Sequence, residues 1–154
     1  MPDCFISYSK SDDELARVVH KSLVEKGLEV FLAPLSVDPG DDWTEKVRTN
    51  LKNSTWVVFL ASKIACTSPY VQQEVGAAIF SNKKLVPIVW DMDPSDLPGW
   101  SNRSQAIDLR GKNQDEIANR IKELARKMKS PDMIGALIVG TILLALVILA
   151  VREK

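Results

Sequence analysis

Near its amino terminus the chain reads Cys4-Phe5-Ile6-Ser7-Tyr8-Ser9-Lys10-Ser11-Asp12-Asp13. This pattern predicts a short buried strand that stops at a polar turn rich in helix-capping residues. Further apolar strands alternate with helical patterns later in the chain, so the first strand should be central in a parallel sheet. Because ligands bind at the carboxyl ends of central strands in such sheets, we expect the functional site near residues 8–10.

Strand and helix patterns alternate along the rest of the chain. Strands are expected over residues 29–32, 56–61, 85–90 and 106–109. Asp12 or Asp13 is expected to cap the first helix, which should end at Gly27, and Ser68-Pro69 should start the third. The helices are marked by apolar residues at helical spacing, namely Leu15, Val18, Val19 and Leu23; Trp43, Val47 and Leu51; Val71, Val75, Ala78 and Ile79; and Ile117, Ile121, Leu124 and Met128. This order predicts a flavodoxin-like α/β fold, a doubly wound parallel sheet of five strands.

Composition excludes several classes of protein. The 154 residues carry 20 basic and 20 acidic side chains, so nucleic-acid binding has no electrostatic support. The two cysteines make neither a disulfide framework nor a metal-ligand cluster. Asp38, Asp41 and Asp42 are better explained by a solvated turn and a helix cap than by a metal site. We therefore expect no metal and no resident cofactor.

The carboxyl-terminal sequence differs from the rest. Residues 133–151 contain no charge and no proline, and as a helix they would extend about 28 Å, close to the thickness of a bilayer core. The segment is preceded by Arg120, Lys122, Arg126, Lys127 and Lys129 and is followed by few cations, which places the domain in the cytoplasm. The sequence thus predicts a domain over residues 1–129, a linker over 130–132, a single-pass membrane anchor over 133–151 and a tail over 152–154.

The predicted fold is shared by several phosphate- and nucleotide-handling proteins, and the residues exclude some of them. A phosphate-accepting receiver domain needs an aspartate at the end of strand three, where this chain has Ala61-Ser62. A flavodoxin needs a Ser/Thr/Gly turn after strand one, but here the turn holds Lys10 and lacks glycine. Neither a G-x-G-x-x-G motif nor a P-loop is present, and the single His20 completes no catalytic triad.

A set of motifs in order resembles the TIR (Toll/interleukin-1 receptor) domain family over about residues 3–129. The motifs are Phe5-Ile6-Ser7-Tyr8-Ser9; Val30-Phe31-Leu32 followed by Asp38-Pro39-Gly40-Asp41-Asp42-Trp43; Ser62 followed by Ser68-Pro69-Tyr70-Val71-Gln72-Gln73-Glu74; and Val86-Pro87-Ile88. The chain departs from the family at Tyr70, where a tryptophan is usual, and at Ser9-Lys10, where some NAD-cleaving members carry two basic residues.

TIR domains are either adaptors that only assemble or enzymes that cleave NAD at the nicotinamide-ribose bond. The resemblance implies that Glu74 is the catalytic carboxylate of an NAD+ nucleosidase that releases nicotinamide and ADP-ribose or a cyclised form. Because Tyr70 and Glu74 are four residues apart on one helix, they should share a face. We expect substrate contacts from Tyr8, Ser9, Lys10, Gly40, Trp43 and Tyr70.

The resemblance also implies how such an enzyme is switched on. Domains stack, and the loop over residues 38–43 of one copy completes the site of the next. The expected partners are therefore NAD+ as substrate, a second copy of the chain, and a membrane through residues 133–151, in defence-type signalling or NAD depletion. The alternative is a non-catalytic adaptor, in which the same surfaces bind another TIR domain and Glu74 is incidental.

Overall fold

A computed structural model of the protein describes residues 2–33, 43–99 and 105–130. Its centre is a single sheet of five parallel strands in the order β2-β1-β3-β4-β5. The strands are β1 (Cys4–Ser7), β2 (Val30–Leu32), β3 (Trp56–Leu60), β4 (Lys84–Val89) and β5 (Ile107–Asp108). The predicted flavodoxin-like parallel sheet is therefore confirmed, with β1 at an inner position between β2 and β3.

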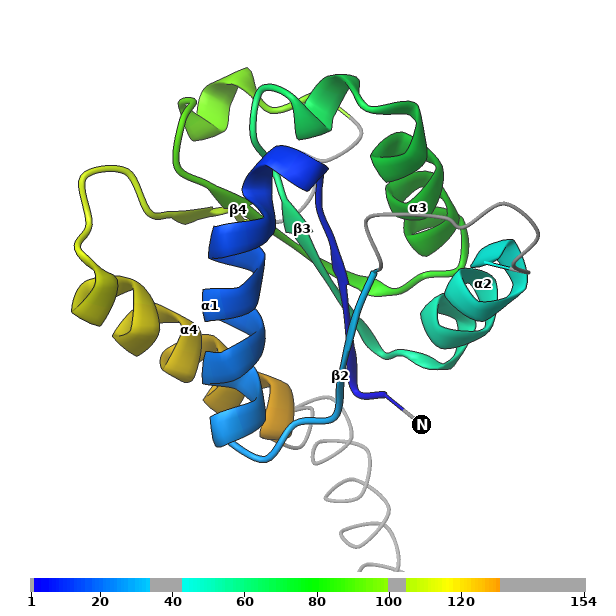
Figure 1. The fold of residues 1–154 in the computed structure, drawn as a ribbon, viewed down its shortest axis with the longest axis horizontal. Coiled ribbons are helices and arrows are strands. Elements are labelled where there is room, and N and C mark those ends of the chain that lie inside the picture. Colours follow the sequence, from blue (N-terminus) through cyan, green and yellow to red (C-terminus); the bar gives the residue numbers. More distant parts are fainter. Residues whose placement is uncertain (1, 34–42, 100–104, 131–154) are drawn as a thin grey trace, which may run out of the picture.

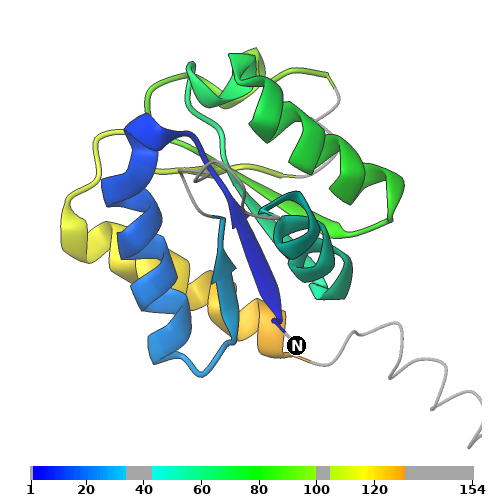
Figure 2. The same ribbon diagram turned by 45° about the vertical axis from the view of Figure 1, so that its right-hand side comes forward.

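Helices cover both faces of this sheet, as Figures 1 and 2 show. On one face α1 (Asp13–Glu25) packs beside α4 (Gln114–Lys129). On the other face α2 (Trp43–Asn53) lies beside α3 (Pro69–Phe80). Short 3-10 turns, η1 (Lys10–Asp12), η2 (Ala65–Thr67) and η3 (Pro94–Asp96), follow β1, β3 and β4. The fold is doubly wound, because α1 lies on one face, α2 and α3 lie on the other, and α4, which follows β5, returns to the face of α1.

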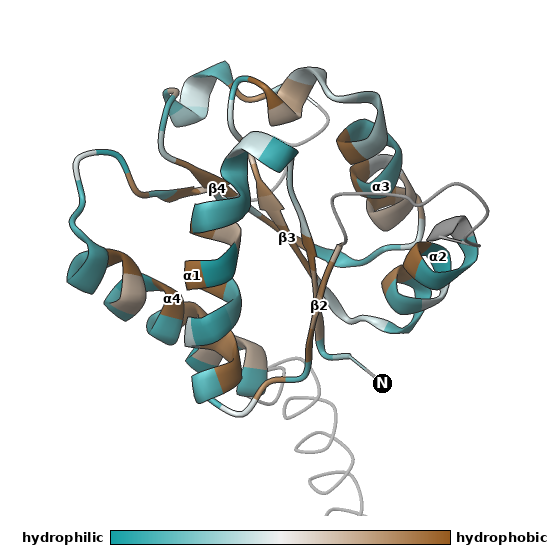
Figure 3. Ribbon diagram, viewed as in Figure 1, coloured by the Kyte–Doolittle hydropathy of each residue, from teal (hydrophilic) through white to brown (hydrophobic). Residues whose placement is uncertain are grey.

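The core consists of the strands and the inward faces of the helices, which appear brown in Figure 3. Every residue of β1 is buried, and the ring of Phe5 stacks on that of Phe31 from β2 with centroids 5.4 Å apart. A large apolar side chain contributes about 2 kcal/mol when it is fully buried. Helical spacing placed Val19, Leu23 and Val75 on buried faces, and all three are fully buried in the structure.

Pro87 lies within a strand that is paired on both sides. The Lys84 N–H donates to the Thr55 carbonyl (3.1 Å) and the Ala61 N–H donates to the Ile88 carbonyl (2.8 Å), so these residues of β4 face β3. Because backbone directions alternate along a strand, the nitrogen of Pro87 faces away from β3. A proline is tolerated there because no donor to β3 is lost.

Strand β5 is shorter than the expected 106–109. It consists of Ile107–Asp108 and pairs with Ile88 and Val89, at the carboxyl end of β4. One further backbone bond, from the Leu109 N–H to the Val89 carbonyl (2.8 Å), closes this edge. Among the described residues, no strand therefore pairs with the first half of β4 on that side.

The predicted membrane anchor over residues 133–151 lies outside the described residues. Within residues 2–33, 43–99 and 105–130, no helix combines the length and apolar character needed to cross a bilayer. The division of the chain into domain, linker, anchor and tail remains a prediction.

A chain cut after Ser130 should remain soluble and cooperatively folded. The buried faces of α1 to α4 already have partners within the described residues, so the core does not need residues 131–154. Thermal melting followed by circular dichroism checks this. Aggregation without a transition, together with cooperative melting of the full chain in detergent, would show that the tail belongs to the fold.

Candidate functional site

Glu74 is a buried carboxylate beside the carboxyl end of β1. It lies in the second turn of α3, which begins at Pro69 after Ser68, and only 8% of its surface is exposed. The hydroxyl of Ser7, the last residue of β1, donates a hydrogen bond of 2.5 Å to Glu74 Oε2. Burial raises the pKa of Glu74 from its ordinary value of 4.5 to about 7, and the bond from Ser7 opposes that rise. The carboxylate therefore titrates near neutral pH.

Tyr8 follows Ser7 directly and is also buried. Burial, together with the negative charge of Asp13, raises the pKa of Tyr8 to about 12, and the charge of Glu74 adds to this effect. The phenol is therefore neutral at physiological pH and can donate a hydrogen bond. The side-chain hydrogen-bond partner of Tyr8 is Asp13, and the charge of Glu74 acts on the phenol more weakly.

A second buried cluster links the turn after β1 to the turn after β3. The hydroxyls of Ser9 and Ser62 each donate a 2.6 Å hydrogen bond to Asp12 Oδ2, and the Ala65 N–H donates to Ser62 Oγ at 3.0 Å. Asp12 was expected to cap the first helix, but its side chain makes no capping hydrogen bond. Asp12 does occupy the N-cap position of α1, but its carboxylate accepts hydrogen bonds from the two buried serine hydroxyls and not from the helix backbone.

The remaining predicted substrate residues are placed unevenly. Lys10 is exposed at the start of η1. Tyr70 and Glu74 are four residues apart on α3 as predicted, yet Tyr70 is 64% exposed because it lies in the first turn, at the rim. Gly40 lies outside the described residues. Trp43 begins α2, but its side chain is not described.

Sequence reasoning missed the roles of Ser7 and Asp12. Both residues are buried and each is bonded to a group far away in the chain, Ser7 to Glu74 and Asp12 to Ser62. The available signal was a serine at the end of an apolar strand: Ser7 ends Cys4–Ser7, and Ser62 follows β3. Such a serine requires a buried partner, since an unpaired hydroxyl would be costly.

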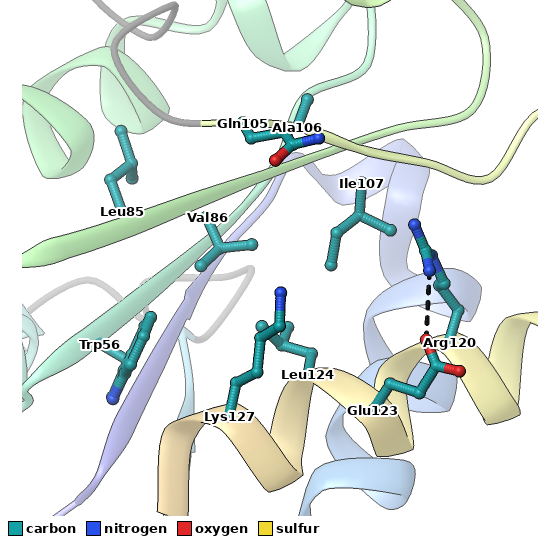
Figure 4. A pocket seen from close by; sticks show the side chains of 10 residues that line it. All are labelled: Trp56, Leu85, Val86, Gln105, Ala106, Ile107, Arg120, Glu123, Leu124 and Lys127. Atoms are coloured by element: carbon teal, nitrogen blue, oxygen red, sulfur yellow. Dashed lines mark hydrogen bonds and ion pairs between the residues drawn. The ribbon is translucent and has the colours of Figure 1, made fainter. Parts of the chain in front are cut away.

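Two hollows in the described part of the protein lie away from Glu74. One, of about 310 Å³, opens beside the first half of β4, where β5 is absent (Figure 4). Apolar side chains of Leu85 and Val86 and an ion pair of 3.1 Å between Arg120 and Glu123 line it. The other, of about 250 Å³, lies between the starts of α1 and α4. Neither of these two hollows is lined by Glu74, and the candidate active site is placed by the buried carboxylate itself.

Comparison with known proteins relates this geometry to a family. A family model described as a TIR domain matches residues 4–125. Among curated proteins the chain is similar to the probable 2' cyclic ADP-D-ribose synthase BdTIR of Brachypodium distachyon, with 32% identity over 97 residues. That match covers 62% of the chain and 43% of the plant protein, so the chain spans less than half of this relative.

Solved structures share the architecture. The TIR domain of the Toll-related receptor TRR-2 from Hydra magnipapillata has a TM-score of 0.68 and 17% identity, covering 84% of this chain and 100% of that one. The TIR domains of the activated Roq1 resistosome give a TM-score of 0.64 and 18% identity, with 83% and 99% covered. At these identities the likeness is one of fold. Together with the match over residues 4–125, it shows that the chain belongs to the TIR domain family.

Proposed function

We propose that this protein is an NAD+ nucleosidase that cleaves the nicotinamide-ribose bond, with Glu74 as its catalytic carboxylate. The observation that carries the proposal is the burial of Glu74 against Ser7, which gives this carboxylate a pKa of about 7. An ordinary helix-surface glutamate would be exposed and would titrate near its usual value. The named activity of the plant relative, a probable cyclic ADP-ribose synthase, supports the same class of reaction.

The chemistry explains why one carboxylate suffices. Ordinary glycosidases use an acid to protonate the leaving oxygen and a second carboxylate on the opposite side of the bond. Nicotinamide is bound as a pyridinium and leaves as a neutral molecule, so no acid is needed. The bond breaks with its electron pair going to the nicotinamide nitrogen, and positive charge develops on the ribose. Ionised Glu74 stabilises that oxocarbenium charge where water is largely excluded. Attack by water, or by a hydroxyl of the same molecule, then gives a linear or cyclic product.

The neighbouring residues would bind and orient the substrate. Ser7 holds the Glu74 carboxylate in place through its 2.5 Å bond, and Tyr8 supplies a neutral phenol at the carboxyl end of the same strand. Asp12 fixes the turn that carries Ser9 and Lys10, through the hydroxyl of Ser9. In this proposal the exposed Lys10 meets the pyrophosphate. The aromatic rings of Tyr70 and Trp43 stack on nicotinamide or adenine.

Activity in this proposal depends on self-association and on the membrane. The loop over residues 38–43, which contains Gly40, completes the site of a neighbouring copy. The structurally similar TIR domains of Roq1 belong to an activated resistosome, which supports an assembled active form. Residues 133–151 anchor the chain in one pass with the TIR domain in the cytoplasm, and confinement to a surface raises the effective concentration for stacking.

Ser7→Ala should shift the pH dependence of NAD cleavage upward by about one pH unit. The Ser7 hydroxyl stabilises the ionised form of Glu74, so its loss raises the pKa of Glu74 further above 7. The active form is the carboxylate, so activity should fall at neutral pH and recover in alkaline solution. Ser54→Ala is the matched control, because Ser54 is buried but bonds to the Asn50 carbonyl instead. An unchanged pH midpoint in Ser7→Ala would contradict the role of this bond.

Gly40→Pro should suppress NAD cleavage and self-association together. The change alters the loop that is proposed to complete a neighbour's site, while the described core does not include it. The melting temperature should therefore stay close to that of the wild type. Analytical ultracentrifugation and an NAD-loss assay on the same preparation check this, and full activity in a strictly monomeric Gly40→Pro protein would rule out the assembly model.

A direct NAD-loss assay separates the enzyme from a non-catalytic adaptor. The full chain is reconstituted in vesicles at increasing surface density, and nicotinamide is measured over time. We expect release that rises more steeply than the protein density, because pairs or stacks of domains form the site. If self-association occurs at high density without any loss of NAD, the protein is an adaptor.

A further inference from the structure

The formal net charge of zero conceals an unequal division between the two ends of the sheet. The carboxyl end comprises the loops after the strands and the first turns of the helices. Among the described residues there, ten carboxylates outnumber five cations. The carboxylates are Asp12, Asp13, Glu14, Glu45, Asp91, Asp93, Asp96, Asp108, Asp115 and Glu116, and the cations are Lys10, Lys46, Lys63, Arg110 and Lys112. The end that carries Glu74 is therefore acidic.

The opposite end, here called the basic end, has the reverse balance. It comprises the last turns of the helices and the residues leading into the strands, with seven described cations against three carboxylates. The cations are Lys26, Lys52, Lys83, Lys84, Arg126, Lys127 and Lys129, and the carboxylates are Asp3, Glu25 and Glu29. The domain is thus electrically polarised along the strand direction.

Two ammonium groups of the basic end are held by neutral acceptors. The ammonium of Lys83 donates to the carbonyl of Lys52, and that of Lys129 donates to the carbonyl of Lys26 at 2.9 Å. These acceptors are neutral, so the bonds fix the two ammonium groups at helix ends without cancelling their charge. Glu25, one of the three carboxylates at this end, lies 3.8 Å from the ammonium of Lys122, which is not counted among the seven cations.

An exposed aromatic side chain accompanies these cations. Phe80, the last residue of α3, is 91% exposed, the highest value among the large apolar side chains of the described residues. The end of α4, orange in Figure 1, lies at the same end of the molecule as the turn from α1 to β2. The chain continues from there through residues 130–132 into the apolar sequence over 133–151. Lysine, arginine and an exposed aromatic ring are the residue types that bind bilayer interfaces.

We propose that the basic end binds the surface of an anionic bilayer, with Phe80 among the headgroups and the end that carries Glu74 facing away. This inference rests on the proposed membrane anchor only for delivery of the domain to the surface. Residues 130–132 can span at most about 10 Å, so the distance between an anchored domain and the headgroups is comparable to the Debye length, which is about 10 Å at 0.1 M salt. Each cation near an anionic surface strengthens binding about fivefold, and the acidic end is repelled.

Fluorescence quenching in vesicles tests the orientation of the full chain. In a Cys66→Ser background, with Cys4 buried, a dye is placed by Ser81→Cys at the basic end or by Gln114→Cys at the start of α4. Ser81 follows the last turn of α3, at the basic end, whereas Gln114 begins α4 at the acidic end. The 16 residues of α4 extend about 24 Å between the two ends of the domain. The vesicles carry a nitroxide quencher on their headgroups. They consist of phosphatidylcholine alone or of phosphatidylcholine with phosphatidylserine, and each kind is measured at about 0.1 M and about 1 M salt.

We expect quenching at position 81 and none at position 114 in anionic vesicles at low salt. The quenching should weaken in neutral vesicles and at high salt, since it depends on charge. The double reversal Arg126→Glu with Lys127→Glu should abolish it, whereas the matched reversal Lys63→Glu with Lys112→Glu, at the acidic end, should not. Equal quenching at the two positions, or quenching indifferent to lipid charge and to both reversals, would overturn the proposal.

Flotation of the same samples separates this inference from the membrane anchor. A full chain that floats with neutral vesicles at high salt is anchored, and the quenching pattern then decides the orientation. If it does not float under those conditions, the anchor fails. Binding of the basic end is then supported by flotation with anionic vesicles at low salt, and it is contradicted if the chain floats with neither kind of vesicle.

Discussion

Glu74→Gln should lower the rate of NAD cleavage about 100-fold at about pH 8, where the wild-type carboxylate is ionised. The substitution keeps the shape of the side chain and an oxygen that accepts the hydrogen bond from the Ser7 hydroxyl. It removes the negative charge that stabilises the developing oxocarbenium ion. Losing one preorganised electrostatic contact of this kind costs on the order of 3 kcal/mol in transition-state stabilisation. The measurement is initial nicotinamide release by wild type and variant at equal surface density.

Glu123→Gln is the matched control for this experiment. Glu123 is also a helical glutamate, but it is exposed and pairs with Arg120 on α4, away from Glu74. Its replacement should leave the cleavage rate near that of the wild type. Binding of an NAD analogue should survive in Glu74→Gln, since the turn over residues 8–10 is unchanged. If Glu74→Gln cleaves NAD as fast as the wild type, Glu74 is not the catalyst.

Glu74→Gln should also stabilise the folded domain in alkaline solution, by up to about 3 kcal/mol relative to the wild type. The carboxyl has a pKa of about 7 when folded against an ordinary value of 4.5. Below the lower value it is protonated in both states, so burial carries no ionisation cost. As the pH rises, the unfolded chain releases its proton first, and wild-type stability falls until the folded carboxyl ionises as well. The same buried charge that serves catalysis therefore destabilises the fold.

Chemical denaturation of the chain cut after Ser130, at about pH 5 and about pH 9, measures this effect. We expect the difference between Glu74→Gln and wild type to grow with pH and to level off above about pH 8. The control Glu123→Gln should show no such growth. If the free energies of unfolding of wild type and Glu74→Gln change in parallel across this range, the pKa of Glu74 is not raised. The main argument for Glu74 as the catalytic carboxylate would then fail.

Local patterns in the sequence were sufficient to predict the sheet and its helices. The strand ending at Ser7 and the helix beginning at Pro69 follow from apolar runs and capping chemistry, which act over a few residues. Strand β5 was predicted too long, because pairing with β4 is formed only at Ile88 and Val89. A strand's length depends on its neighbour, and the neighbour is not visible in the local pattern.

The candidate site was only partly predictable for the same reason. Glu74 was identified through the family resemblance, but its burial depends on a contact with Ser7 that joins residues 67 positions apart. Asp12 looked like a helix cap because helix starts favour aspartate. Its carboxylate instead accepts a hydrogen bond from Ser62, 50 positions away. The helix backbone and the serine hydroxyl compete for this carboxylate, and the outcome depends on the assembled fold. Tyr70 shares a helix face with Glu74, yet spacing alone could not show that one is at the rim and the other is buried.

The most direct test of the central claim is a product analysis of NAD incubated with the full chain at high density in vesicles. Wild type should convert NAD to equal amounts of nicotinamide and ADP-ribose, linear or cyclic, while Glu74→Gln at the same density leaves NAD almost intact. Chromatography with mass detection resolves all of these species. If NAD persists unchanged with wild-type protein that is folded and self-associated, the protein does not cleave NAD and the proposed function is wrong.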